Sequence, residues 1–424
     1  MHQTHTLPNG LRIICEQRKS PVVYCGYVIM AGTRDEAEAD AGMAHFIEHM
    51  TFKGTQRRRA CHINNGLERV GGDLNAFTNK QETVYYATLL REHLPRAIDL
   101  LTDIVFHSTY PQHEIEREVE VICDEIDSYL DTPSELIFDD FESLIFKGSA
   151  LGRDILGKAE RLREYTTADA LRFTRRHYRP DHAVLFVLGD VDIAKVARCV
   201  EQQFARYPLE KPDEIAVFRH PQPHDYSRDL TAIPRESRHV FRQKDTHQAH
   251  VMIGNVAFGG TDERKPALSL LNNMLGGPGM NSRLNMAVRE RAGLVYSIDS
   301  YVSTFPDTGY WNIYFGCDPK DVRRCCNLIE REIRRFIQVQ LTPTQLAAAK
   351  RQLRGQLGIS TDAHENYALA MAKTFAWYNH HRDIAKIFDE IEEITAEELS
   401  DLAAHIYNPD TAYRLIYAPS PIHL

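Results

Sequence analysis

The stretch Ala31-Gly-Thr-Arg-Asp-Glu36 in the first half of the chain has a counterpart in the second half, Gly259-Gly-Thr-Asp-Glu-Arg264. Each stretch interrupts a β-branched, apolar segment typical of a strand and leads through a polar turn into a segment typical of a helix. One constant shift in numbering carries each position of the first stretch to its counterpart in the second. The two stretches therefore suggest that one fold is encoded twice.

The same shift returns near the other end of each half. It carries Thr167-Ala-Asp169 to Thr395-Ala-Glu397, and with one further position it carries Tyr178-Arg-Pro-Asp181 to Tyr407-Asn-Pro-Asp410. A shift that is constant from one end of a half to the other predicts a duplicated domain. The alternative is a pair of unrelated domains that happen to use similar turns.

Strands and helices are interspersed in both halves. Strands are expected at 11–15, 22–30, 73–78, 82–90, 183–188 and 251–257, and helices at 41–52, 63–70, 93–106, 112–130, 134–146, 159–164, 168–177 and 267–275, with Gly54 as a helix cap. This pattern predicts an α+β fold of two homologous domains, each a mixed, mostly antiparallel sheet packed with helices. We place the domains at 1–212 and 230–424, joined by a proline-rich linker at 213–229.

The first expected helix contains the pattern H-x-x-E-H, formed by His45, Glu48 and His49. Residues four apart lie about 40° apart around a helix, so both imidazoles can reach one metal ion. This is the order of H-E-x-x-H zinc hydrolases in reverse. The alternative is two surface histidines beside a glutamate. The shifted positions in the second half are Asn273, Gly276 and Gly277, so only one copy carries the pattern.

A catalytic zinc ion takes three protein ligands and keeps one open position. The acidic helix expected at 112–130 can supply the third ligand as a carboxylate. Glu118 and Glu125 are separated by two helical turns and are therefore nearly eclipsed on that helix. Spacing alone does not choose between them.

Composition sets further limits on function. The chain has 424 residues and a net charge of −9, which argues against a nucleic-acid partner. Its eight cysteines form no C-x-x-C pair, which indicates reduced thiols. No apolar run reaches the ~20 residues of a membrane span, and no targeting segment is recognisable. We therefore expect a cytoplasmic protein, and we interpret the basic run Arg57-Arg-Arg59 as a solvated turn.

With these motifs, the chain resembles the pitrilysin/insulinase-type zinc peptidases, and most closely their half-length members akin to processing peptidases. The resemblance runs from Leu7-Pro-Asn-Gly-Leu11 to the last strand. It implies that Glu125, in the acidic helix downstream of His49 and followed by Ile126, is the third zinc ligand, with one Zn²⁺ per chain. It also implies that Glu118 supports the site from behind the ligands.

The resemblance further implies how a peptide substrate is held. The stretch Gly71-Gly-Asp-Leu-Asn-Ala-Phe-Thr78 resembles an edge strand to which a peptide adds, with Asn75, Ala76 and Phe77 lining the groove. In the second half, Arg289-Glu-Arg-Ala-Gly-Leu-Val-Tyr296 resembles an R…GLxY element, in which Arg289 and Tyr296 hold the substrate and the developing oxyanion.

The implied activity is zinc-dependent endopeptidase chemistry, with Glu48 activating the attacking water. Members twice this length face an Arg/Tyr domain against the zinc domain across a closed chamber. A half-length chain is therefore expected to form a homodimer, in which Arg289 and Tyr296 act on the other subunit. The substrate is expected to be a peptide or unfolded segment whose sequence the chain does not reveal.

Two competing interpretations remain. A non-catalytic scaffold or peptide-binding subunit of the same family is one, although such relatives usually lose H-x-x-E-H. The other is a nucleotide- or phosphate-dependent enzyme that uses the glycine loops. The loop Gly276-Gly-Pro-Gly279 lacks the Lys-Ser/Thr of a P-loop, which argues against it.

Overall fold

A computed structural model of the chain describes residues 2–209 and 234–422. The chain separates into two compact units. Unit 1 contains the described residues up to Ser128, the described first-half residues from Gly148 onward, and the segment Ser360–Arg382. Unit 2 contains Tyr129–Lys147, the described second-half residues up to Ile359, and those from Asp383 onward. The predicted linker at 213–229 lies outside the described residues.

Unit 1 is built on a six-stranded sheet with the order β1-β2-β6-β3-β5-β4. Its strands are β1 (His2–Thr6), β2 (Arg12–Gln17), β3 (Val22–Ile29), β4 (Asp73–Thr78), β5 (Thr83–Leu90) and β6 (Ala183–Gly189). β2 and β6 run parallel, and the other neighbours are antiparallel. Its helices are α1 (Met43–Thr51), α2 (Ala60–Glu68), α3 (Leu94–Phe106), α4 (Gln112–Leu130), α6 (Ala159–Leu162), α7 (Thr167–His177), α8 (Ile193–Arg206) and α13 (His364–Tyr378).

Unit 2 is built on a five-stranded sheet with the order β7-β11-β8-β10-β9. Its strands are β7 (His239–Gln243), β8 (Ala249–Ala257), β9 (Val295–Thr304), β10 (Gly309–Cys317) and β11 (Tyr413–Ala418). Here β7 and β11 are the parallel pair. Its helices are α5 (Pro133–Ile145), α9 (Arg235–Arg238), α10 (Lys265–Gly276), α11 (Val322–Gln338), α12 (Pro343–Ser360), α14 (Ile384–Glu393) and α15 (Ala396–Ile406), with a π-helical turn at Asn285–Glu290.

The two sheets have the same topology once the additional β1 of unit 1 is set aside. β2, β6, β3, β5 and β4 take the places of β7, β11, β8, β10 and β9, and the single parallel pair of each described sheet occupies the same place in both. Each sheet packs against its own apolar cluster. The predicted α+β class and internal duplication are thereby confirmed.

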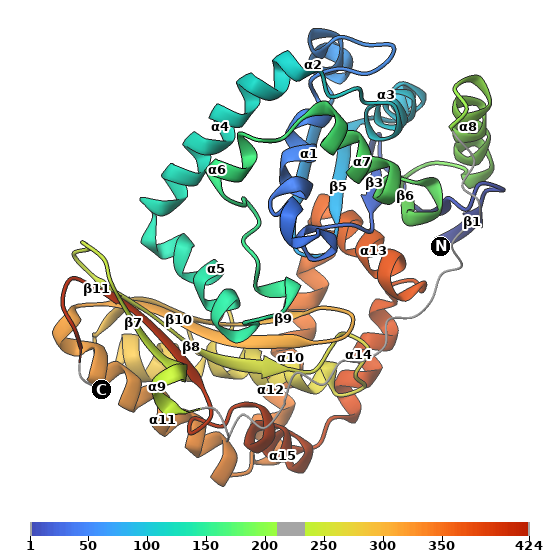
Figure 1. The fold of residues 1–424 in the computed structure, drawn as a ribbon. Coiled ribbons are helices and arrows are strands. Elements are labelled where there is room, and N and C mark those ends of the chain that lie inside the picture. The colour runs from blue at the N-terminus through green and yellow to red at the C-terminus, as the bar shows by residue number, and fades with distance from the viewer. Residues whose placement is uncertain (1, 210–233, 423–424) are drawn as a thin grey trace. The chain divides into compact units, whose positions relative to one another are not determined.

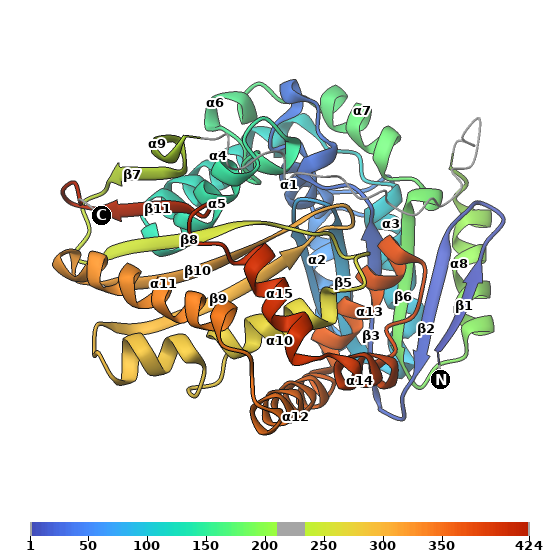
Figure 2. The ribbon, with the colours of Figure 1, turned by 90° about the horizontal axis from the view of Figure 1, so that it is seen from below.

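One helix in each unit comes from the other half of the chain. α13, from the second half, packs on β3 and β6 of unit 1, and Figure 2 shows it lying across these strands. α5, from the first half, packs on β8 and β11 of unit 2, on the sheet face opposite to α11 and α15 (Figure 1). The compact units therefore depart from the sequential division into 1–212 and 230–424 at these two helices.

Two smaller expectations were wrong. α1 is capped by Phe52 and not by Gly54, which lies beyond the cap with φ +144°. Arg57 and Arg58 do not form a solvated turn, because their guanidinium groups are largely buried and make ion pairs with Asp99 and Asp103 on α3. None of the described helices is long and apolar enough to cross a membrane.

Candidate metal centre

The helix that carries H-x-x-E-H is held firmly at its N-terminus. The carboxylate of Glu36 accepts hydrogen bonds from the backbone N–H groups of Gly42 (3.0 Å) and Ala44 (2.8 Å), which are among the donors left unpaired where a helix starts. Gly42 has φ +87°, and a Cβ there would lie 2.8 Å from the Cα of Gly157. A glycine is therefore required for this close approach.

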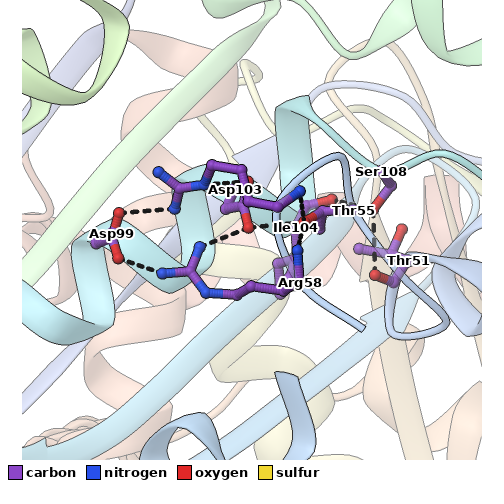
Figure 3. A network of polar contacts seen from close by, with 8 residues as sticks. Thr51, Thr55, Arg58, Asp99, Asp103, Ile104 and Ser108 are labelled. Carbon is purple, nitrogen blue, oxygen red and sulfur yellow. Dashed lines mark hydrogen bonds and ion pairs between the residues drawn. The ribbon is translucent and has the colours of Figure 1, made fainter. Parts of the chain in front are cut away.

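The C-terminus of α1 is anchored to α3. Ser108 Oγ donates to the carbonyl oxygens of Thr51 (3.1 Å) and Ile104 (2.7 Å). Beyond the helix, Thr55 donates to Asp103 (2.8 Å), and Arg58 pairs with Asp103 and Asp99 (Figure 3). The apolar face of α1, with Met43, Ala44, Phe46, Ile47 and Met50, is buried in the core of unit 1. Both ends and one face of the helix are thus fixed.

Three predicted ligands converge. His45 and His49 on α1 and Glu125 on α4 place one ligand atom each within 4.8 Å of one another. Nε2 of His45 lies 3.8 Å, and Nε2 of His49 3.5 Å, from the same oxygen of Glu125. A tetrahedral zinc ion with ligand bonds of about 2.0–2.1 Å separates its donor atoms by roughly 3.3 Å. The two imidazoles and the carboxylate therefore fit zinc in donor type and in spacing.

Glu118 occupies a different place from Glu125. Its Oε1 lies 3.0 Å from Nδ1 of His49, the ring nitrogen that faces away from Glu125, and its other oxygen pairs with Lys53. Burial opposes ionisation of Glu118, but the hydrogen bonds from His49 and Lys53 lower its pKa. A carboxylate in this position fixes the orientation and tautomer of a metal-binding histidine. The geometry separates the two glutamates that spacing left equivalent.

The protonation state of His45 suits metal binding. Its side chain is only 9% exposed, and burial together with the neighbouring His49 lowers its pKa to about 3. A neutral imidazole is the form that binds a metal ion. Nδ1 of His45 is buried and has no hydrogen-bonding partner among the described residues.

Glu48 lies beside the ligand cluster and is half-buried. Burial raises its pKa, as does the charge of Glu125, while a hydrogen bond with Thr78 and the charge of His49 act in the opposite direction. Thr78 ends β4, so the carboxylate stands between the ligand cluster and this strand. A carboxylate beside a ligand cluster is placed to take up and release a proton during a reaction there.

β4 is an edge strand of its sheet and, among the described strands, pairs with β5 alone. It contains Asn75, Ala76 and Phe77, the residues predicted to line a peptide groove. The other two predicted residues lie in unit 2. Arg289 belongs to the π-helical turn and contacts Glu290 at 3.5 Å, and Tyr296 is 86% exposed on the edge strand β9.

Sequence reasoning missed Glu36, Lys53 and Thr78. Each acts through a contact made by folding: a backbone cap, an ion pair to Glu118, and a hydrogen bond to Glu48. The one available signal was Glu36, an acidic residue a few positions before a helix, where carboxylates are favoured.

The chain is similar to known proteins along most of its length. Residues 12–159 match the insulinase family (peptidase family M16), and residues 164–353 match the peptidase M16 inactive domain. The uncharacterized zinc protease YmxG of Bacillus subtilis is 31% identical over 98% of both chains. The uncharacterized zinc protease SCO5738 of Streptomyces coelicolor is 34% identical over 95% of this chain and 86% of its own.

A protease from Helicobacter pylori has the same fold, with a TM-score of 0.87, 20% identity, and coverage of 99% of this chain and 100% of its own. The cluster of His45, His49 and Glu125 lies within the part of the chain that matches the insulinase family. The chain therefore belongs to the insulinase family, peptidase family M16.

Proposed function

We propose that this protein is a zinc-dependent endopeptidase that hydrolyses peptides or unfolded segments. The observation that carries the proposal is the convergence of His45, His49 and Glu125 within 4.8 Å, with the half-buried Glu48 beside them. His45, His49 and Glu125 would hold one zinc ion. When bound, zinc supplies a Lewis acid that polarises a carbonyl and lowers the pKa of water.

Other side chains around the proposed zinc site have separate roles. Glu48 takes the proton from the attacking water and returns it to the leaving amine, a role that its place between the ligand cluster and β4 favours. Glu118 keeps the His49 ring in orientation through the 3.0 Å contact to Nδ1. The free edge of β4 pairs with the peptide backbone, with Asn75, Ala76 and Phe77 along the groove.

A homodimer completes this proposal. Arg289 and Tyr296 would stabilise the developing oxyanion in a zinc site of a second copy, which gives the exposed Tyr296 ring a function. The alternative, a non-catalytic subunit, takes some support from the match to an inactive domain. That match spans residues 164–353, whereas His45, Glu48, His49 and Glu125 all lie within residues 12–159.

The decisive experiment is Glu48→Gln. We expect this variant to bind zinc as tightly as the wild type but to hydrolyse an unstructured peptide about a thousandfold more slowly, the range for loss of a general base. Zinc content by mass spectrometry and cleavage of a quenched fluorescent peptide library measure the two properties. Near-wild-type turnover in the zinc-loaded variant would show that Glu48 is not the base.

The same variant tests the dimer. Glu48→Gln and Tyr296→Phe subunits are each expected to be inactive, and their mixture to regain part of the activity, because a mixed dimer holds one intact site. A covalently linked heterodimer that stays inactive would contradict the assignment of Tyr296 to a second copy.

A further inference from the structure

The side chains of β4 point alternately to two sides of the sheet. Leu74 and Ala76 pack against the core cluster that contains the apolar face of α1. Phe77 points to the opposite side, where the ammonium group of Lys373 lies 4.7 Å from the centre of its ring. Asn75 shares that side and donates to Asp73 at 2.8 Å. The two faces of the edge strand therefore differ in chemistry.

α13 lies on the same side of the sheet as Phe77 and contacts the neighbouring strand β5. Glu365, in its first turn, accepts hydrogen bonds from Tyr86 (3.3 Å) and Thr88 (3.2 Å) of β5. Trp377, near its end, donates to Glu82 at 2.8 Å. The side of the sheet that Phe77 faces therefore carries side chains from the second half of the chain.

Lys373 of α13 is the positively charged residue beside Phe77. Its Nζ lies 3.2 Å from an oxygen of Glu82, a carboxylate that is 5% exposed and also accepts hydrogen bonds from Trp377 and Asn79. The Lys373 side chain is itself 34% exposed. An ammonium group has three donors, so Lys373 retains capacity for a second acceptor after pairing with Glu82.

We propose that Lys373 determines substrate specificity by selecting an acidic side chain in the peptide at the position opposite Phe77. The proposal rests on the proposed addition of the peptide to β4. Directly opposed residues of antiparallel strands have Cβ atoms about 5 Å apart, so an Asp or Glu opposite Phe77 reaches the ammonium group above the ring. The carboxylates of Asp73 and Glu365 give the other end of the face a negative charge, which confines the preference to one position.

Binding with hydrolysis disabled tests the inference. The probe is a fluorescent Ala-rich peptide in which Glu replaces Gln at each position in turn, titrated into zinc-loaded Glu48→Gln protein at low salt. We expect Glu to tighten Kd about threefold to tenfold at one position, the range for a partly exposed, charge-assisted pair.

When Lys373→Gln is added to the Glu48→Gln protein, the preference for Glu over Gln should disappear. The Gln peptides should still bind within about twofold of their former affinity. Lys373→Arg should retain the preference, because the charge is kept. Lys386→Gln is the matched control: it removes a lysine that is 74% exposed on α14 of unit 2, and it should change nothing.

The outcomes separate this inference from the proposed activity. A Glu preference that persists in Lys373→Gln, or equal binding of all Glu and Gln peptides, would overturn the role of Lys373 whether or not the wild type cleaves them. If the preference depends on Lys373 but the wild-type protein cleaves no peptide, the inference is supported and only the proposed hydrolysis is overturned.

Discussion

Unit 1 and unit 2 share one strand order but differ in the chemistry of their corresponding helices. In unit 1, α1 carries His45 and His49, and α4 faces them with Glu118 and Glu125. In unit 2, the shifted positions fall at Asn273, which is buried, and at the end of α10. α12, which follows α11 as α4 follows α3, contains no Asp or Glu between Pro343 and Ser360. Unit 2 therefore lacks both halves of the proposed ligand set.

The corresponding place in unit 2 is used for close packing. A Cβ on Gly276 would lie 2.7 Å from Cβ of Ser300 on β9, so the end of α10 approaches the sheet too closely for a side chain. Asn272 ties this helix to β9 by accepting a hydrogen bond from Ser300 (2.6 Å), and to the end of α15 by accepting one from Tyr407 (3.1 Å). This contrast indicates that the fold does not require a metal ion, because the same strand order is held together in unit 2 without the ligands.

Removing a ligand should have the largest effect. His45→Ala is expected to weaken zinc binding more than about a hundredfold, beyond the range for residues outside the ligand set, because only two donors remain. Asn273→Ala, at the shifted position, is expected to leave about one zinc per chain. Zinc content after dialysis measures both, and circular dichroism checks folding. Zinc loss in Asn273→Ala would contradict the assignment of the metal to unit 1 alone.

A smaller loss of zinc affinity is expected when Glu118, which contacts His49, is removed. Glu118→Ala should weaken zinc binding about tenfold to a hundredfold, because Nδ1 of His49 loses its partner and Lys53 its counter-charge. Competition with a chelating dye measures the affinity. Glu116→Ala, an exposed acid on the same helix, is the control. Equal affinities for the two variants would mean that Glu118 does not orient His49.

The smallest expected effect is on the pH dependence of stability, and it concerns the residues that precede α1 in unit 1 and α10 in unit 2. Burial raises the pKa of Glu36 from 4.5 to about 8, whereas Arg264, its counterpart in the repeat, pairs with Asp262 near the surface. A carboxyl group with a raised folded pKa contributes stability that is fully present below its unfolded pKa and is lost as the pH rises through the folded pKa of about 8. Unit 1 should therefore lose up to about 1.4 kcal/mol of unfolding free energy per pH unit between these two values.

Glu36→Gln should flatten this pH dependence in unit 1 alone. The chain has two tryptophans, Trp377 in unit 1 and Trp311 in unit 2, so fluorotryptophan NMR follows urea unfolding of each unit separately. An unchanged pH profile at the Trp377 signal would contradict the expected titration of Glu36.

Local patterns predicted much of the fold. The turn Ala31-Gly-Thr33 and its counterpart indicated the duplication, and the apolar stripe of α4 placed that helix at Gln112–Leu130 as expected. Spacing did not choose between Glu118 and Glu125, because a separation of two turns puts both on one side of the helix. Only the family resemblance pointed to Glu125. Docking against α1 decides which of them faces the two Nε2 atoms.

Contacts between distant segments account for the other gaps. The burial of Arg57 and Arg58 depends on acids that lie on another helix, α3. The contact between Lys373 and Phe77 depends on α13, which belongs to the opposite half of the chain from β4. Periodicity and turn residues report local geometry, and neither encodes which distant helix covers a given face of a sheet.

The exchange of α5 and α13 also has a consequence for biosynthesis. When the first half of the chain has left the ribosome, β3 and β6 are complete, but the helix that covers them has not been translated. Contacts between segments so far apart in sequence form late and leave apolar surface exposed in the meantime. Unit 1 therefore cannot complete its packing until Tyr378, at the end of α13, has emerged from the ribosome. Until then one face of its sheet stays uncovered.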